Sequence, residues 1–108
     1  MSLRNVTNKN RLEKALADAV EAANWLLPEE RRLNTSPETL LMGNDSRLDS
    51  LGLVNLIVAV EQKIEEEFGV SVVLLNEESM SQKPSPFRTL GSLANHALQL
   101  LNRHAVNR

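Results

Sequence analysis

The stretch NDSRLDSLGLVNLIVAVEQ, Asn44 to Gln62, contains the pattern that decides the fold of this 108-residue chain. Aliphatic residues recur at helical spacing from Ser50, and Gly69 supplies the left-handed cap that would end the helix at Phe68. With about 100° per residue, one aliphatic stripe predicts a surface that faces the core. It comprises Leu53, Ile57, Val60 and Ile64, with Leu56 and Phe68 at its margins.

A second aliphatic group lies on the same predicted helix, displaced by about 130° from the first. It comprises Leu51, Val54 and Val58. One stripe is enough to attach a helix to a core, so the second group needs another explanation. Periodicity leaves two alternatives open, namely burial against a closing helix or exposure as a docking surface.

Helices are also expected on either side of this one. Lys9 to Leu27 is amphipathic and stops before Pro28, which does not continue a helix comfortably. Its inward positions are Leu12, Leu16, Ala19, Val20, Ala23, Leu26 and Leu27. Thr89 is expected to cap a closing helix whose inward residues are Leu90, Leu93, Ala97, Leu98 and Leu101. Together these patterns predict an all-α fold, a small bundle of the four-helix type.

The connections between these helices are expected to differ in character. Residues 28–49 form a turn-rich loop of about twenty residues, and its leucines indicate that it packs on the core. Val70 to Leu75 is rich in β-branched residues, but no partner strand is expected, so we predict an extended, irregular segment. Residues 76–87 are polar with two prolines and predict a flexible loop, which enlarges the region before the last helix.

Length and composition limit the classes of function. We expect one domain over residues 1–108, with residues 1–8 and 104–108 frayed. Such a chain is short for an enzyme that must enclose its substrate, so a carrier, adaptor or regulator without catalysis of its own is expected. The sequence contains no apolar run of about 18 residues, and its N-terminus lacks the apolar stretch of a signal peptide. We therefore predict no membrane span and a cytoplasmic location.

Charge and ligand-bearing residues exclude further classes. Residues 44–68 carry six acidic and two basic side chains, a balance that disfavours nucleic acid as a partner. Cysteine is absent, so the chain itself offers neither a disulfide nor a thiolate. His96 and His104 lie eight positions apart without a neighbouring ligand, so no metal site is predicted and both are expected to be exposed.

The Asp49–Ser50 pair at the start of the central helix has a structural interpretation and a chemical one. Either side chain can cap the helix, because both accept hydrogen bonds from free N–H groups of the first turn. Gly52 also matches the trailing glycine of the G-x-S-x-G motif of hydrolases. However, Leu48 occupies the leading position, no strand precedes it, and the chain is too short for that fold.

The run LDSLGLVNLIVAVE, followed by EEEFGVSV, resembles the second-helix signature of acyl carrier proteins. The resemblance extends in order over the whole chain, through a first amphipathic helix, a long loop, this helix, an irregular passage and the closing TLGSLANHAL. It implies the small acyl-carrier bundle as the fold.

By this resemblance, Ser50 is the attachment site for the covalent cofactor 4'-phosphopantetheine, which a phosphopantetheinyl transferase takes from coenzyme A. Asp49 is the matching acid, expected to help position the metal and coenzyme A of that transferase. The thiol of the arm holds acyl groups as thioesters, which accounts for a carrier without cysteine. A helix N-terminus stabilises the phosphodiester by about 0.3 to 1 kcal/mol.

The resemblance also implies partners, which are acyl-transferring or chain-building enzymes that act on a monomeric carrier. The residues expected to recognise them are Leu51, Val54, Val58 and the flanking acid Glu61. The core stripe is expected to line the pocket that shelters an acyl chain, which assigns that role to Leu53, Ile57, Val60 and Ile64.

The chain departs from the family pattern in ways that affect its partners. Gly52 and Asn55 stand where family members usually have acids, so the surface near Ser50 is less negative and a dedicated set of partners is implied. About one extra helical turn lies between Glu61 and Phe68.

Three functions follow as expectations. The first is a specialised acyl carrier protein of a dedicated lipid, lipopolysaccharide or secondary-metabolite pathway. The second is an aminoacyl or peptidyl carrier protein, which the apolar second stripe does not exclude. The third is a helical interaction module that keeps the carrier fold and is never modified.

Overall fold

A computed structural model describes residues 3–43 and 46–106, with the side chains of residues 8–43 and 46–103. Its helices are α1 (Leu3–Asn24), α2 (Ser50–Phe68), α3 (Glu77–Ser81) and α4 (Leu90–Val106), and a 3-10 turn, η1 (Glu29–Arg31), lies in the first loop. No β-strand occurs within these described ranges, so the predicted all-α bundle is confirmed in its helical character. None of the described helices combines the length and hydrophobicity needed to cross a membrane.

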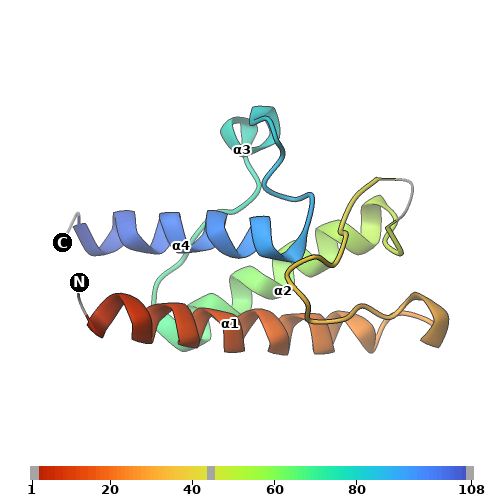
Figure 1. Cartoon of the computed structure of the whole chain (residues 1–108), viewed down its shortest axis with the longest axis horizontal. Helices are drawn as coiled ribbons and strands as arrows, with labels where there is room; N and C mark the ends of the chain where they lie inside the picture. Colours follow the sequence, from red (N-terminus) through yellow and green to blue (C-terminus); the bar gives the residue numbers. More distant parts are fainter. Residues whose placement is uncertain (1–2, 44–45, 107–108) are drawn as a thin grey trace.

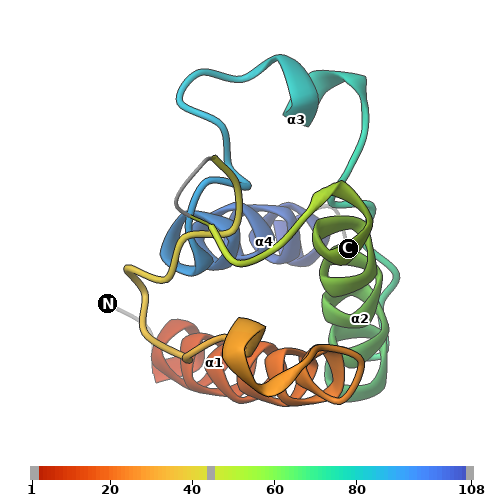
Figure 2. The same ribbon diagram turned by 90° about the vertical axis from the view of Figure 1, so that its right-hand side faces the viewer.

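The three long helices form the body of the molecule. α1 and α4 run side by side in opposite directions, and α1 starts at the end of the molecule where α4 finishes (Figure 1). α2 crosses along one side of this pair, as the rotated view shows (Figure 2). α1 contacts both other long helices, while the short α3 stands beyond α4.

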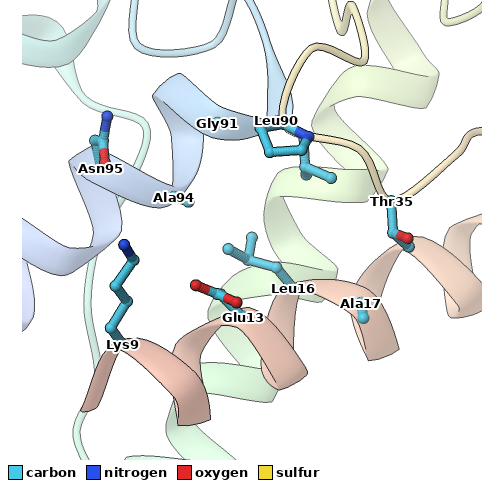
Figure 3. A pocket seen from close by; sticks show the side chains of 10 residues that line it. Lys9, Glu13, Leu16, Ala17, Thr35, Leu90, Gly91, Ala94 and Asn95 are labelled. Carbon is cyan, nitrogen blue, oxygen red and sulfur yellow. The ribbon is translucent and has the colours of Figure 1, made fainter. Parts of the chain in front are cut away.

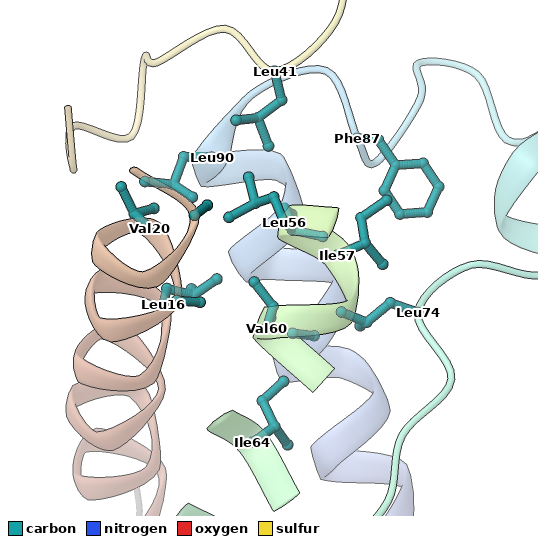
Figure 4. Close-up of a cluster of buried hydrophobic side chains, with 14 of the residues drawn as sticks. Leu16, Val20, Leu41, Leu56, Ile57, Val60, Ile64, Leu74, Phe87 and Leu90 are labelled. Carbon is teal, nitrogen blue, oxygen red and sulfur yellow. The ribbon is translucent and has the colours of Figure 1, made fainter. Parts of the chain in front are cut away.

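The core lies where α2 faces α1 and α4. The stripe predicted for α2 points into it, and Leu56, placed at the margin by the sequence pattern, is fully buried at its centre (Figure 4). Leu53 and Phe68 are half-buried and pack against its edge. The other helices contribute Leu16, Val20, Leu90 and Leu93 to the same cluster. Both ends of α2 agree with the sequence, because Asp49 caps it and Gly69 has the left-handed φ of 71°.

α1 begins six residues earlier and ends three residues earlier than predicted. Residues 3–8 and 104–106, expected to be frayed, are the ends of α1 and α4, and residues 1–2 and 107–108 lie outside the described residues. Fraying at these ends stays a prediction. The early end has a specific cause. The Asn24 side chain accepts a hydrogen bond from the Leu33 N–H at 2.8 Å and donates one to the Leu33 carbonyl at 3.0 Å, which turns the chain back on itself.

The residues after this early end leave the buried face. Pro28 disfavours a helical conformation at the residue before it, so the helix cannot extend to Leu27. Leu26 is therefore 74% exposed instead of directed inward, and its neighbour Trp25 is 82% exposed. Leu27 remains half-buried against the core.

The first loop packs on the core as predicted and is fastened to the start of α4. Leu33, Leu41 and Leu48 are buried, although Met42 is exposed. The backbone N–H groups of Leu41, Leu90 and Gly91 donate to the carbonyls of Arg88, Thr39 and Pro37, each at 2.9 Å. A Cβ at Gly91 would lie 3.0 Å from the Pro37 carbonyl oxygen, so a larger residue here would push the loop and α4 slightly apart.

α4 begins as the sequence predicts. The Ser92 N–H donates to the Thr89 hydroxyl, and the Thr89 N–H donates to the Ser92 hydroxyl, both at 3.0 Å, which forms a reciprocal cap. Of the five residues predicted to face inward, Leu98 is half-buried. The other four are buried, namely Leu90, Leu93, Ala97 and Leu101.

The segment between α2 and α4 is partly different from the prediction. Residues 70–74 belong to no helix or strand, as expected, and the chain bends at residues 75–76. Val72 and Leu74 are buried. The prediction of a flexible loop from residue 76 is wrong for Glu77–Ser81, because these residues form the helix α3. A reciprocal cap explains it, because the Ser79 N–H donates to the Asn76 side chain and the Asn76 N–H donates to the Ser79 hydroxyl.

The predicted exposure of His96 is also wrong. The imidazole is buried, with Nε2 2.9 Å from the Leu74 carbonyl oxygen and the ring edge-on to Phe87. It therefore fastens the extended segment to α4, because the ring can donate to a carbonyl that the core shields from water. The side chain of His104 lies outside the described residues.

We expect Ile57→Asp to lose at least about 4 kcal/mol of unfolding free energy, because an aspartate there must be desolvated without a partner. The matched variant Val54→Asp should stay within about 1 kcal/mol of the parent, since Val54 is 42% exposed. Urea unfolding followed by far-UV circular dichroism measures both. Equal losses would show that Val54 belongs to the core.

His96→Leu is expected to destabilise the fold by about 1 to 3 kcal/mol, because it leaves the Leu74 carbonyl without its donor. The control Asn95→Leu changes an exposed neighbour on α4 and should alter stability by about 0.5 kcal/mol or less. If both substitutions have the same effect in urea unfolding, the His96 hydrogen bond contributes nothing.

Candidate functional site

The start of α2 places an exposed hydroxyl next to a satisfied helix cap. Asp49 has extended backbone angles, and its Oδ1 accepts a hydrogen bond from the Gly52 N–H at 2.7 Å. The cap is therefore Asp49, and Ser50 is the exposed first residue of the helix. The first-turn N–H groups and the helix dipole give this position a partial positive charge, which favours an anion.

Gly52 is favoured by the tight packing of this cap. A Cβ at residue 52 would lie 3.2 Å from both Asp49 Oδ1 and Leu48 Cδ2. Leu48 is buried and belongs to the core cluster, so it has little freedom to move away. The absence of an acid at Gly52, where family members usually have one, therefore has a local structural reason. It also makes the surface near Ser50 less negative.

The second aliphatic group of α2 faces water. Leu51 is 70% exposed, Val54 42% and Val58 44%. Burial against the closing helix is thereby excluded, and these three residues are called the exposed stripe below. Val54 lies one turn from Ser50 and Val58 two turns, so the stripe starts beside the hydroxyl and runs along the helix.

A pocket of about 230 Å³ lies between the end of α1 and the start of α2. Its walls include Leu26 and Pro28 on one side and Leu51 on the other, with Arg31 and Asp49 as its charged members. Leu26 was expected in the core, so sequence reasoning missed its place at this surface. Helical periodicity could not predict the surface position of Leu26, because the end of α1 is determined by the contact between Asn24 and Leu33.

The residues predicted to line an acyl pocket occupy the core. Ile57, Val60 and Ile64 are buried among side chains of α1 and α4, and Leu53 is half-buried at the margin of that cluster. Any chain entering there must displace these side chains, because protein interiors are close-packed. Their role in sheltering an acyl group stays a prediction.

The acidic residues of α2 lie in its second half and have partners within the protein. Glu61, predicted to meet partner enzymes, accepts a hydrogen bond from the Leu74 N–H at 2.8 Å and so helps to hold the extended segment. The other contacts are Glu65 with the Ser71 hydroxyl, Glu66 with Lys63, and Glu67 with Arg11, whose guanidinium also lies over the Phe68 ring. The recognition role of Glu61 stays a prediction beside this structural one.

A larger pocket of about 530 Å³ lies between α1 and α4. Figure 3 shows Lys9 and Glu13 on α1 across from Ala94 and Asn95 on α4, with Leu16 between the two helices. Its lining comes from α1, α4 and the first loop, without a residue of α2, so it is separate from the Ser50 site. No group of three potential metal ligands occurs among the residues that the structure describes.

Comparisons with known proteins return no match, whether against family models, curated proteins or solved structures. The residues and geometry around Ser50 are therefore the basis for a functional assignment.

Replacing Glu61 separates its structural role from any role in recognition. Glu61→Ala should accelerate amide hydrogen exchange at Leu74 by about tenfold or more, because a charge-assisted hydrogen bond is lost. Glu61→Gln keeps an acceptor oxygen and should preserve most of the protection. Unchanged exchange in Glu61→Ala would show that the contact does not hold the extended segment.

Proposed function

We propose that this protein is an acyl carrier that bears a 4'-phosphopantetheine arm on Ser50. The observation that carries the proposal is the exposed Ser50 hydroxyl on the first residue of α2, directly after the Asp49 cap and beside the exposed stripe. The hydroxyl is accessible to a modifying enzyme, and the cap does not depend on it. Modification would therefore leave the helix start intact.

The residues around Ser50 fit the proposed arm. When bound, the arm supplies a thiol on which acyl groups are carried as thioesters, and the cysteine-free chain offers no competing thiol. First-turn N–H groups of α2 would stabilise the phosphodiester at Ser50 by about 0.3 to 1 kcal/mol. Asp49 keeps Oδ1 in the cap, and we assign its carboxylate a second role in orienting the metal and coenzyme A of the phosphopantetheinyl transferase.

The surface beside Ser50 supports a role in presentation rather than catalysis. An enzyme that receives the acyl group must approach Ser50, and the exposed stripe gives it apolar area to bury there. We assign the chain to a discrete, monomeric carrier in the cytoplasm that serves acyl-transferring or chain-building enzymes of a dedicated lipid, lipopolysaccharide or secondary-metabolite pathway.

The exposed stripe also favours a second candidate, a helical interaction module that is never modified. Leu51, Val54 and Val58 would bind a protein partner in that case, and Ser50 would be an ordinary first-turn residue. An aminoacyl or peptidyl carrier is the third alternative and shares the attachment chemistry. The state of Ser50 after exposure to a transferase separates the carriers from the module.

We expect the purified chain to gain the mass of one arm when incubated with coenzyme A and a phosphopantetheinyl transferase of broad specificity. Ser50→Ala should fold and gain none, because it removes the acceptor while Asp49 keeps the cap. Intact mass spectrometry measures the gain, and peptide mapping locates it. The matched controls Ser36→Ala and Ser46→Ala should be modified like the parent.

Two outcomes contradict this assignment. An arm on Ser36 or Ser46 would move the attachment site to the first loop. A parent chain that gains no arm would favour the unmodified interaction module.

A further inference from the structure

We infer that the enzymes acting on this carrier dock through an apolar contact formed by Leu26, Leu51 and the rest of the exposed stripe, and not through acidic residues of α2. The partner surface that fits is uncharged, with an apolar side chain directed into the pocket between α1 and α2. This inference rests on the proposed function, since it concerns the partners of the arm on Ser50.

The part of α2 nearest to Ser50 carries no charge. The run SLGLVNLIVAV, residues 50–60, contains no ionisable side chain. Glu61 is the first acid of the helix and lies about 16 Å along the axis from Ser50, at 1.5 Å per residue. That distance is twice the screening length of about 8 Å at physiological ionic strength. A partner positioned over Ser50 therefore meets no charged side chain of α2 within the screening length.

The acidic side chains in the second half of α2 also have partners within the protein. Arg11 contacts the carboxylate of Glu67 at 3.0 Å, and Lys63 contacts that of Glu66 at 3.6 Å. Glu61 is bound to the backbone of the extended segment, so this inference departs from the recognition role that the resemblance predicted for Glu61. Glu61 and Glu65 have no cation beside them among the described residues, and Glu65 accepts a hydrogen bond from the Ser71 hydroxyl at 3.2 Å. About 22 Å of helix separates Glu65 from Ser50.

The charged residues that line the pocket beside Ser50 are of opposite sign. They are Arg31 and Asp49. Arg47 donates to the Arg32 carbonyl at 2.9 Å, which brings the two loop segments together. The lining of this pocket therefore offers a basic partner patch no excess of negative charge to complement.

The apolar part of the surface has the form of an anchor site. Leu26 and Leu51 are 74% and 70% exposed, and both line the pocket of about 230 Å³. Two large apolar side chains from separate elements thus border one depression next to Ser50. A partner that inserts an apolar side chain there removes the exposed surface of both leucines from water, which favours binding.

Transfer of the arm measures this contact with a defined probe. The probe is a phosphopantetheinyl transferase of broad specificity with coenzyme A, and the readout is its KM for the 108-residue chain. The KM is measured between about 0.01 M and about 1 M NaCl, where the screening length falls from about 30 Å to about 3 Å. A carrier with an acidic second helix serves as the salt control.

We expect the KM for the parent chain to change less than about threefold over this range, while that of the acidic control rises further. Leu26→Ser and Leu51→Ser should each raise the KM about tenfold, because each removes apolar contact area. The matched variants Glu65→Gln and Glu66→Gln should leave it unchanged. Circular dichroism confirms that the variants fold, as expected for exposed positions.

Each contrary outcome has a distinct meaning. A parent chain that receives no arm at any salt concentration overturns the proposed function and this inference with it. An arm acquired with a KM that rises steeply with salt, and that is indifferent to Leu51→Ser, overturns this inference alone. Self-association of the parent in sedimentation equilibrium, abolished by Leu51→Ser, would show that a second copy of the chain occupies the face, and would also overturn it.

Discussion

The backbone hydrogen bonds that fasten residues 37–41 to residues 88–91 determine how the rest of the molecule is arranged. A connection of about twenty residues between two helices would otherwise carry many unsatisfied N–H and C=O groups onto the core. Fastened to the start of α4, the loop buries Leu41 and then Leu48, the residue directly before the Asp49 cap. The position of Ser50 is therefore set from outside α2 as much as by the helix itself.

How far the fold could be predicted depends on how local the relevant interactions are. The bounds of α2 were predicted because Asp49 and Gly69 act on neighbouring residues, and the start of α4 was predicted for the same reason. The end of α1 was not, because it depends on a hydrogen bond between Asn24 and Leu33 across a turn. α3 was missed because its Asn–Ser cap is too short a signal against a polar, proline-containing background.

The candidate site shows the same division between local and tertiary information. The pattern of α2 identified two aliphatic stripes but did not show whether the second is buried or exposed. Periodicity alone does not indicate on which side of α2 the other helices, α1 and α4, pack. Neither the burial of His96 nor the hydrogen bond accepted by Glu61 could be predicted from the sequence, for a related reason. Both side chains bind the backbone of Leu74, which is 22 positions from His96 and 13 from Glu61. A single backbone donor or acceptor produces no recognisable sequence pattern.

The exposure of Trp25 has a practical consequence for spectroscopy. It is the one tryptophan of a chain without tyrosine, and it is 82% exposed in the folded state. Its indole is thus surrounded by water before and after denaturation, so intrinsic emission will respond weakly to melting of the aliphatic core. The same indole stands next to Leu26 at the end of α1, which makes it a native fluorophore for events at that end of the protein.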